Sequence, residues 1–215
     1  MKLGVFDSGI GGKAVALSLE KAFPAATILT VNDSRNVPYG NKTKEQVFEL
    51  TRAAIQPLLE ADCDIIILAC NTATAVAIEK LRALYPHQKF IGLEPMIKTA
   101  ASMTQTKKIA ICATPATLSS ERYVNLKQKF AADITVIEPD CSDWAYLIEN
   151  NQINKRHIES VVQQVRKNDA DIIVLACTHY HWIQDTIRIT AGSAISVIEP
   201  SEAIVRRVSQ LLVQN

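Results

Sequence analysis

The stretch DCDIIILACNT at residues 62–72 returns almost unchanged as DADIIVLACTH at residues 169–179. Each copy runs from an acidic start through branched apolar residues to a cysteine, which is followed by side chains that form hydrogen bonds. An apolar run of this length between helical patterns is typical of a strand buried on both faces of a parallel sheet. The repeat therefore predicts two equivalent strands, with Cys70 and Cys177 at their carboxyl ends.

Strand and helix patterns alternate along the rest of the chain. The strand patterns lie at residues 3–6, 27–31, 64–69, 90–93, 108–113, 134–137, 171–176 and 194–198. Helical patterns include residues 44–60, 74–84, 117–130, 155–167 and 201–213. This alternation predicts an α/β fold with mostly parallel sheets and helices on their faces.

The internal repeat extends beyond the two cysteine strands. KLGVFDS at residues 2–8 parallels KIAICAT at 108–114, and LEP at 93–95 parallels IEP at 198–200. We therefore expect two pseudo-symmetric α/β lobes, one formed by residues 1–96 with 201–215 and the other by residues 97–200. Ligands of open α/β sheets bind at the carboxyl ends of the strands. The sequence thus predicts an active site in a cleft between the lobes, with one thiol from each.

The composition is that of an ordinary globular protein. The chain has 215 residues, 48% of them hydrophobic and 21% charged, with a formal net charge of +1. Neither nucleic acid nor a membrane is an expected partner at this charge balance. No signal peptide and no membrane-spanning apolar stretch is visible. We expect a cytoplasmic protein, in which five cysteines stay reduced.

The two strand-end cysteines invite a catalytic interpretation. A buried cysteine is usually a small apolar core residue, and this interpretation suits Cys63, Cys112 and Cys141. Cys70 and Cys177 differ, because they hold equivalent positions and each precedes polar residues and the start of a helix. A helix amino terminus stabilises a thiolate, the form that acts as a base. The close ligand pairs typical of zinc sites are missing, so the pattern favours two thiols that move protons.

Polar residues near these cysteines are further candidates. Asp7 and Ser8 end the first strand and share a sheet edge with Cys70, although an aspartate at such a turn is more often a helix cap. His179 lies two residues after Cys177, so it could orient that thiol or pass a proton to it. A lone histidine is more often a hydrogen-bonded structural residue.

A rival motif lies in the first turn. GIGGKA at residues 9–14 fits the G-x-G-x-x-A pattern of a dinucleotide site, and Asp33 follows the second strand where such a site has its ribose-binding carboxylate. Asp7, however, brings a negative charge close to where a pyrophosphate needs positive potential. A dinucleotide-binding oxidoreductase is therefore the weaker alternative, as is a non-catalytic binding protein that kept the fold.

Five segments together resemble the glutamate racemases of the aspartate/glutamate racemase superfamily. They are VFDSGIGG at residues 5–12, VPYG at 37–40, ACNTA at 69–73, ATPAT at 113–117 and CTHY at 177–180. They occur in family order across nearly the whole chain, so the combination is highly specific. The chain departs from the family pattern at residues 32–34, 140–145 and 199–201, and none of these changes removes a proton-transfer group.

The resemblance implies a cofactor-independent, two-base racemase that interconverts L- and D-glutamate and supplies D-glutamate for peptidoglycan. It implies that Cys70 acts on D-glutamate with help from Asp7, and that Cys177 acts on L-glutamate with help from His179. Glu149 matches a family glutamate near the histidine and is an auxiliary candidate. The positions expected to hold the amino and carboxylate groups of the substrate are Ser8, Tyr39, Gly40, Asn71, Thr72, Thr114, Thr117 and Thr178.

The resemblance leaves the nearest alternative open, which is a racemase of another acidic amino acid such as aspartate. It implies no metal, and a homodimer is an expectation from the resemblance alone.

Overall fold

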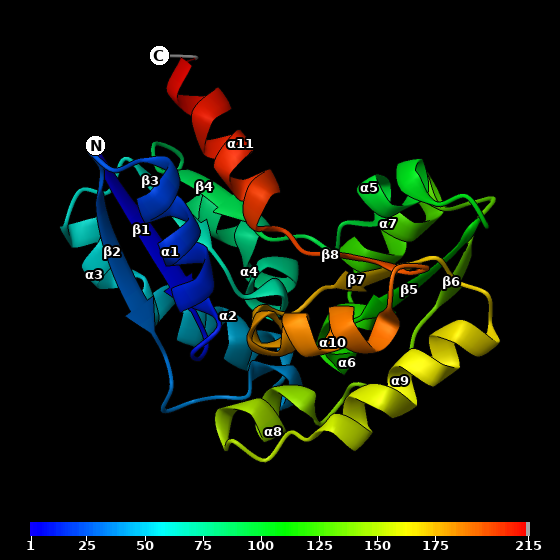
Figure 1. Cartoon of the computed structure of the whole chain (residues 1–215). Coiled ribbons are helices and arrows are strands. Elements are labelled where there is room, and N and C mark those ends of the chain that lie inside the picture. The colour runs from blue at the N-terminus through cyan, green and yellow to red at the C-terminus, as the bar shows by residue number, and fades with distance from the viewer. Residues whose placement is uncertain (214–215) are drawn as a thin grey trace. The chain divides into compact units, whose positions relative to one another are not determined.

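The computed structural model in Figure 1 describes residues 1–213. The chain forms two compact units. The first unit contains Met1–Glu94 and the residues from Pro200 onward, and the second contains Pro95–Glu199. The sequence pattern predicts the two boundaries at nearby positions, after residues 96 and 200.

The first unit is a four-stranded parallel sheet in the order β2-β1-β3-β4. Its strands are β1 (Lys2–Asp7), β2 (Thr27–Asn32), β3 (Ile65–Leu68) and β4 (Lys89–Gly92). In Figure 1, α1 and α11 cover one face, and α2, α3 and α4 cover the other. These helices are α1 (Gly12–Ala22), α2 (Lys44–Ala54), α3 (Gln56–Glu60), α4 (Asn71–Leu84) and α11 (Ser201–Val213).

The repeated apolar run explains why β3 lies at the centre of this unit. Ile65 and Ile67 point into the core shared with α1 and α11, whereas Ile66 and Leu68 point into the core shared with α2 and α4. Successive strand residues face opposite sides of a sheet, so only a continuous apolar run satisfies two covered faces. The strand prediction from this run is confirmed.

The second unit repeats the same arrangement, with strand order β6-β5-β7-β8 and all strands parallel. Its strands are β5 (Lys108–Cys112), β6 (Thr135–Ile137), β7 (Ile172–Leu175) and β8 (Ser196–Ile198). One face is covered by α8 (Trp144–Glu149), α9 (Lys155–Lys167) and α10 (Gln184–Ala191), and the other by α5 (Ile97–Met103), α6 (Pro115–Leu118) and α7 (Glu121–Phe130). The predicted fold class, two similar parallel α/β units, is confirmed.

The repeat includes the turns that lead into the cysteine strands. Asp62 precedes β3 with φ of 51°, and Asp169 precedes β7 with φ of 56°. Aspartate is one of the non-glycine residues that tolerates this left-handed region. The two units therefore share backbone geometry as well as strand order.

Two predicted helices are each divided in the structure. The pattern at residues 44–60 forms α2 and α3, which meet at Ile55, and Pro57 lies in the first turn of α3. Proline lacks the backbone N–H that a continuous helix needs, but it fits a first turn. The pattern at residues 117–130 is interrupted because the Ser120 side chain accepts a hydrogen bond from the Tyr123 amide and caps a new helix, α7.

The two cysteines are followed by different structures. After Cys70 the α-helix α4 begins at once, as expected. After Cys177 the chain forms a 3₁₀ helix, η2 (Thr178–Ile183), before α10 begins. Each cysteine thus precedes the start of a helix, as expected, but the helix after Cys177 is of the 3₁₀ type. None of the helices in residues 1–213 has the length and apolar character that a membrane span requires.

Candidate active site

The carboxyl ends of β1 and β3 bring Ser8 and Cys70 together in the first unit. The sheet register pairs Phe6 with Leu68, so Ser8 and Cys70 each lie two residues beyond a paired position. Ser8 Oγ donates a hydrogen bond to Cys70 Sγ at 3.3 Å, and the Ala73 amide donates to the same sulfur at 3.4 Å. These two donors and the positive end of the α4 dipole stabilise a thiolate at Cys70.

Asp7 lies in the interior beside this sulfur-bearing turn and is wholly buried. Its Oδ1 accepts a hydrogen bond from the Gly9 amide at 2.8 Å. A Cβ atom on Gly12 would lie 2.6 Å from the Asp7 Cβ, so only glycine fits there. The glycine-rich turn therefore packs around the protein's own carboxylate, and its first amide binds that carboxylate. A dinucleotide site would need this amide for a phosphate.

Tyr39 begins a short 3₁₀ turn, η1 (Tyr39–Asn41), and its hydroxyl donates to Asp33 Oδ2 at 2.7 Å. The Asn36 side chain donates to both Asp33 oxygens at 3.0 Å. Burial and the bond to Asp33 raise the pKa of Tyr39, so the phenol stays neutral. The Tyr39 hydroxyl is already bound to Asp33, and the substrate contacts expected of Tyr39 and Gly40 stay a prediction.

Sequence reasoning missed the supporting role of Asp33. Its position directly after β2 was visible, because β2 ends at the same sheet edge as β1 and β3. Nothing in the sequence, however, indicates that a tyrosine six residues later would return to it.

Asn71 follows Cys70 and is only 4% exposed. Neither polar atom of its side chain has a hydrogen-bond partner within residues 1–213. A buried polar group without a partner costs about 1–3 kcal/mol, so such groups are rare in native proteins. An amide that both donates and accepts, next to a thiolate-stabilising turn, is suited to a bound amino acid. Thr72, the next candidate, is also buried.

The second unit places Thr114 and Cys177 at the corresponding sheet edge. Cys112 pairs with Leu175 in the register of β5 and β7, so Thr114 and Cys177 again follow their strands by equal steps. Cys177 Sγ lies 3.7 Å from His179 Nδ1. Thr114 and Cys177 therefore hold the positions in the second sheet that Ser8 and Cys70 hold in the first sheet.

His179 links the sulfur to a carboxylate. Its Nε2 lies 2.7 Å from Glu149 Oε1 at the end of α8, and its side chain is 4% exposed. A carboxylate on one ring nitrogen fixes the orientation of an imidazole and stabilises its protonated form. The structure therefore brings the predicted residues Cys177, His179 and Glu149 together as a thiol, an imidazole and a carboxylate in series, a set called the Cys177 relay below.

The remaining predicted threonines differ in their surroundings. Thr114 caps α6, and its Oγ1 lies 3.0 Å from Thr117 Oγ1 and accepts from the Thr117 amide at 3.4 Å. Thr117 is wholly buried, which makes it a support for Thr114. Thr178 begins η2 and is buried beside the cysteine.

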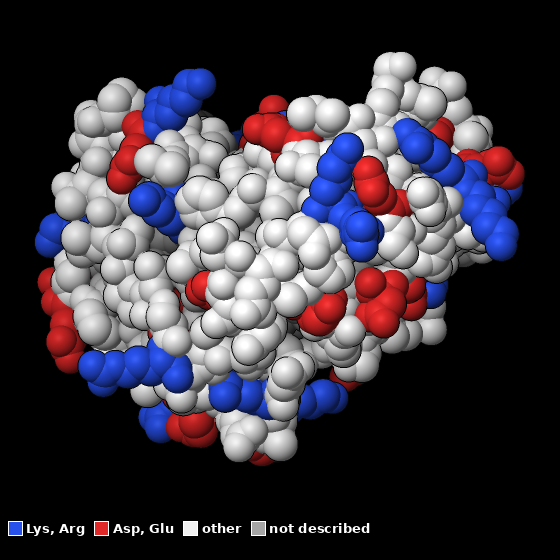
Figure 2. Space-filling view, turned by 60° about the horizontal axis from the view of Figure 1, so that its bottom comes forward, with Lys and Arg blue, Asp and Glu red and all other residues white. Residues whose placement is uncertain are grey.

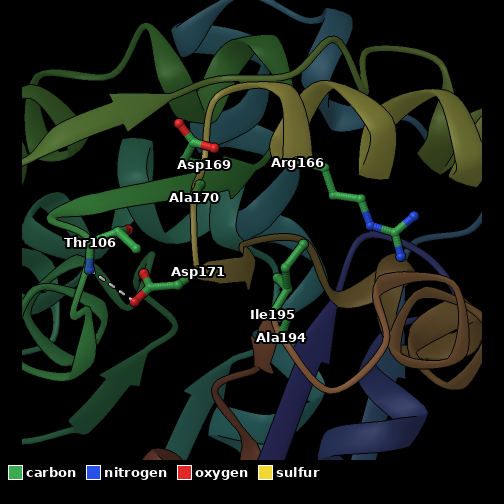
Figure 3. Close-up of a pocket in the computed structure, with 7 residues that line it drawn as sticks. All are labelled: Thr106, Arg166, Asp169, Ala170, Asp171, Ala194 and Ile195. Carbon is green, nitrogen blue, oxygen red and sulfur yellow. Dashed lines mark hydrogen bonds between the residues drawn. The ribbon is translucent and has the colours of Figure 1, made fainter.

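A depression of about 310 Å³ lies at the opposite edge of the second sheet (Figure 3). It is lined by Thr106, Arg166, Asp169, Ala170, Asp171, Ala194 and Ile195. The charged groups there serve local structure. Asp171 accepts a hydrogen bond from the Thr106 amide, which is the dashed line in Figure 3. Arg166 donates a hydrogen bond to the backbone oxygen of Thr190. This depression is not the candidate site.

Charged side chains of both signs are scattered among uncharged ones on the face shown in Figure 2. Within residues 1–213, no group of three or more histidine, cysteine and acidic side chains is arranged to hold a metal ion.

The fold and the two cysteine turns define a class, a duplicated parallel α/β protein with one thiol at the same sheet edge of each repeat. The model of the Asp/Glu/Hydantoin racemase family matches residues 13–208. The chain is 39% identical to a glutamate racemase from Sulfurovum sp. (strain NBC37-1), over 98% of this chain and 82% of the relative. It is 33% identical to a glutamate racemase from Ectopseudomonas mendocina, over 99% of this chain and 82% of the relative.

The solved structures that this chain resembles include glutamate racemases as well. Escherichia coli glutamate racemase in complex with L-glutamate and the activator UDP-MurNAc-Ala is 25% identical, with a TM-score of 0.90 over 98% of this chain and 82% of that chain. Campylobacter jejuni glutamate racemase is 29% identical, with a TM-score of 0.80 over 98% of this chain and 85% of that chain. The chain belongs to the Asp/Glu/Hydantoin racemase family. The predicted enzyme class, an amino-acid racemase, is confirmed.

Proposed function

We propose that this protein interconverts L- and D-glutamate without a cofactor. The observation that carries the proposal is the pair of equivalent strand-end cysteines, each beside groups that stabilise or move a proton. Relatives that are named glutamate racemases support glutamate as the substrate.

In the proposed reaction the two cysteines act on the same α-carbon from opposite faces. With D-glutamate, the Cys70 thiolate takes the α-proton, so the C–H bond breaks and an S–H bond forms. The Cys177 thiol then gives its proton to the other face of the carbon, which leaves a thiolate at Cys177. With L-glutamate the two roles are exchanged. No electron is gained or lost, so the scheme needs no redox partner.

The difficult part of this reaction is the negative charge that develops next to the substrate carboxylate. Hydrogen-bond donors held in place around the carboxylate favour the transition state over the bound substrate. The unpartnered Asn71 amide, the Thr114 hydroxyl and the backbone of η1 are the proposed donors. Exclusion of water would strengthen each of these interactions.

The accessory groups serve the two sulfurs differently. His179, held by Glu149, accepts a proton from Cys177 or returns one to it. Asp7 is proposed to assist proton transfer at Cys70. Both thiols must stay reduced for this chemistry, so we place the reaction in the cytoplasm, where its product would supply D-glutamate for peptidoglycan. We also propose a homodimer, which sedimentation of the purified protein would test.

The proposal is tested by following the circular dichroism of L-glutamate incubated with the purified protein. The signal is expected to decay to zero, and the same decay is expected from D-glutamate. Parallel incubations with L-aspartate distinguish a racemase of another acidic amino acid. A signal that stays constant with glutamate, or a tight complex with a nicotinamide dinucleotide in titration, would contradict the proposal.

A further inference from the structure

We propose that Tyr180 is a positioning residue for the Cys177 relay, an inference that rests on the proposed function. Tyr180 belongs to η2, the same turn that carries His179, and it is wholly buried. Its amide donates to the Cys177 carbonyl at 3.1 Å. A displacement of this side chain would therefore move the backbone on which both the sulfur and the imidazole are built.

The Tyr180 hydroxyl fastens this turn to a second segment. It donates to the Cys141 carbonyl at 2.8 Å, and its ring meets the Trp144 ring edge-on, with centroids 5.2 Å apart. Trp144 begins α8, and α8 ends with Glu149, whose carboxylate contacts His179. The turn and α8 are thus joined at both ends, by Tyr180 at one end and by the imidazole–carboxylate contact at the other.

This double attachment fixes the spacing of the relay. The Glu149 carboxylate can orient the imidazole only while α8 and η2 keep their relative position, and the tyrosine bond sets that position at the far end of α8. Burial raises the pKa of Tyr180 well above its usual value, so the phenol keeps its proton and can donate it to the Cys141 carbonyl.

The thiol of Cys141 is not a rival base in this region. A hydrogen bond to Cys112 and burial raise its pKa, so it stays protonated. Its contribution to the relay is the backbone carbonyl that accepts the Tyr180 hydroxyl. The hydroxyl is therefore the atom to remove in a test.

The variant Tyr180→Phe keeps the ring and its contact with Trp144 but loses the bond to Cys141. Its matched control is Tyr123→Phe in the same unit, where a buried hydroxyl donates to Glu138 at 2.7 Å without touching the relay. The readout is the pH profile of alkylation by iodoacetamide, with Cys177 and Cys70 quantified separately by mass spectrometry in each sample. This readout needs no racemase activity.

We expect Tyr180→Phe to slow alkylation of Cys177 about tenfold across its pH profile, because a displaced imidazole no longer takes up the thiol proton. The Cys70 profile serves as the internal standard and should not move. We expect kcat for glutamate to fall about tenfold with little change in KM, since a shift below 1 Å is enough for such a loss. Tyr123→Phe should change none of these values.

Unchanged Cys177 profiles and unchanged kcat in Tyr180→Phe would overturn the positioning role, as would an equal effect of Tyr123→Phe. If Tyr180→Phe does not fold, Trp144→Phe replaces it. That variant keeps the hydroxyl bond, weakens the ring contact, and should shift the Cys177 profile in the same direction by a smaller amount. An unshifted profile would then overturn the proposal. Failure of the wild-type protein to racemise glutamate would instead contradict the proposed function.

Discussion

The two cysteine turns have the same position in their sheets but different surroundings. Cys70 caps an α-helix of 14 residues and accepts hydrogen bonds from the Ser8 hydroxyl and the Ala73 amide. Cys177 precedes a 3₁₀ helix and contacts the imidazole of His179. The first turn stabilises negative charge on sulfur with fixed donors, and the second offers a group that itself gains and loses a proton.

Equivalent positions show how the repeats diverged. The residue two places after the cysteine is Thr72 in the first unit and His179 in the second. Beyond the neighbouring strand, the equivalent residue in the first unit is Ser8, whose hydroxyl donates to the sulfur. In the second unit it is Thr114, which caps α6. The position of the sulfur was kept while the groups that handle its proton changed. We therefore expect substitutions in the two turns to differ in kind as well as in size.

The largest effect is expected from removing either sulfur. Cys70→Ala and Cys177→Ala should each lower racemisation by at least about a thousandfold with both enantiomers, because each direction needs one base and one acid. The measurement is the initial rate by circular dichroism. Cys63→Ala, which removes a buried sulfur from the first core, should retain kcat. A single sulfur variant that racemises at the parent rate would refute the two-thiol scheme.

The next effect concerns the accessory groups. His179→Asn and Asp7→Asn should each lower kcat by about 100-fold, the lower end of the range typical of one acid–base group. The two variants should slow the two directions unequally in kcat, while kcat/KM for the two enantiomers stays equal because their equilibrium constant is 1. Initial rates with α-deuterated L- and D-glutamate identify the slowed step. Equal and negligible effects would remove both residues from the scheme.

A smaller effect is expected at the donors to the first sulfur. Ser8→Ala removes one hydrogen bond to Cys70, so the thiolate should be less stable and the midpoint of Cys70 alkylation should rise by about half to one pH unit. Thr114→Ala, at the equivalent place in the second unit, should leave the Cys70 profile unchanged. A Cys70 profile that responds equally to both variants would show that the Ser8 bond has no specific role.

The smallest effect compares the aspartates that begin the two repeated strands. Asp171 accepts hydrogen bonds from the Gln105 and Thr106 amides, whereas Asp64 accepts one from the Lys2 amide. Asp171→Ala should therefore lower the free energy of unfolding by about 1–2 kcal/mol, and Asp64→Ala by about half as much. Urea denaturation followed by far-ultraviolet circular dichroism provides the measurement at pH 7.

The pH dependence of this difference follows from the Asp171 pKa. Burial alone would raise that pKa, but hydrogen bonds from Thr104, Gln105 and Thr106 outweigh burial and lower it. A carboxyl with a lowered pKa in the folded state stabilises the protein above its unfolded pKa of about 4. This stabilisation is lost as the pH falls through the lower, folded value. The gap between Asp171→Ala and the wild type should therefore narrow below pH 4, and a constant gap would contradict the assignment.

Much of this architecture is predictable from the sequence because its causes are local. The DCDIIILACNT run has the continuous apolar pattern of a strand covered on both faces, and its repetition predicts the second unit. The division at Ile55 and the Ser120 cap were missed because an apolar helical pattern continues across both positions. Pro57 was a visible warning, since it cannot continue a helix.

The candidate site also contains residues that the sequence predicts and contacts that it does not. Cys70, Cys177 and Asp7 follow from strand ends, because the carboxyl edge of a parallel sheet is set by topology. The Asp33–Tyr39 bond and the Tyr180–Cys141 bond join positions that no short-range pattern connects. Such contacts depend on how loops pack, and the sequence does not encode loop packing through any periodicity.

Racemisation in D₂O shows whether two sulfurs act on opposite faces of one α-carbon. The protein is incubated with L-glutamate, and both enantiomers are separated at low conversion for mass spectrometry. We expect the D-glutamate formed to carry one deuteron at the α-carbon and the remaining L-glutamate to carry none. D-glutamate that retains its original proton, or L-glutamate that gains deuterium as fast as D-glutamate forms, would rule out the two-sulfur mechanism.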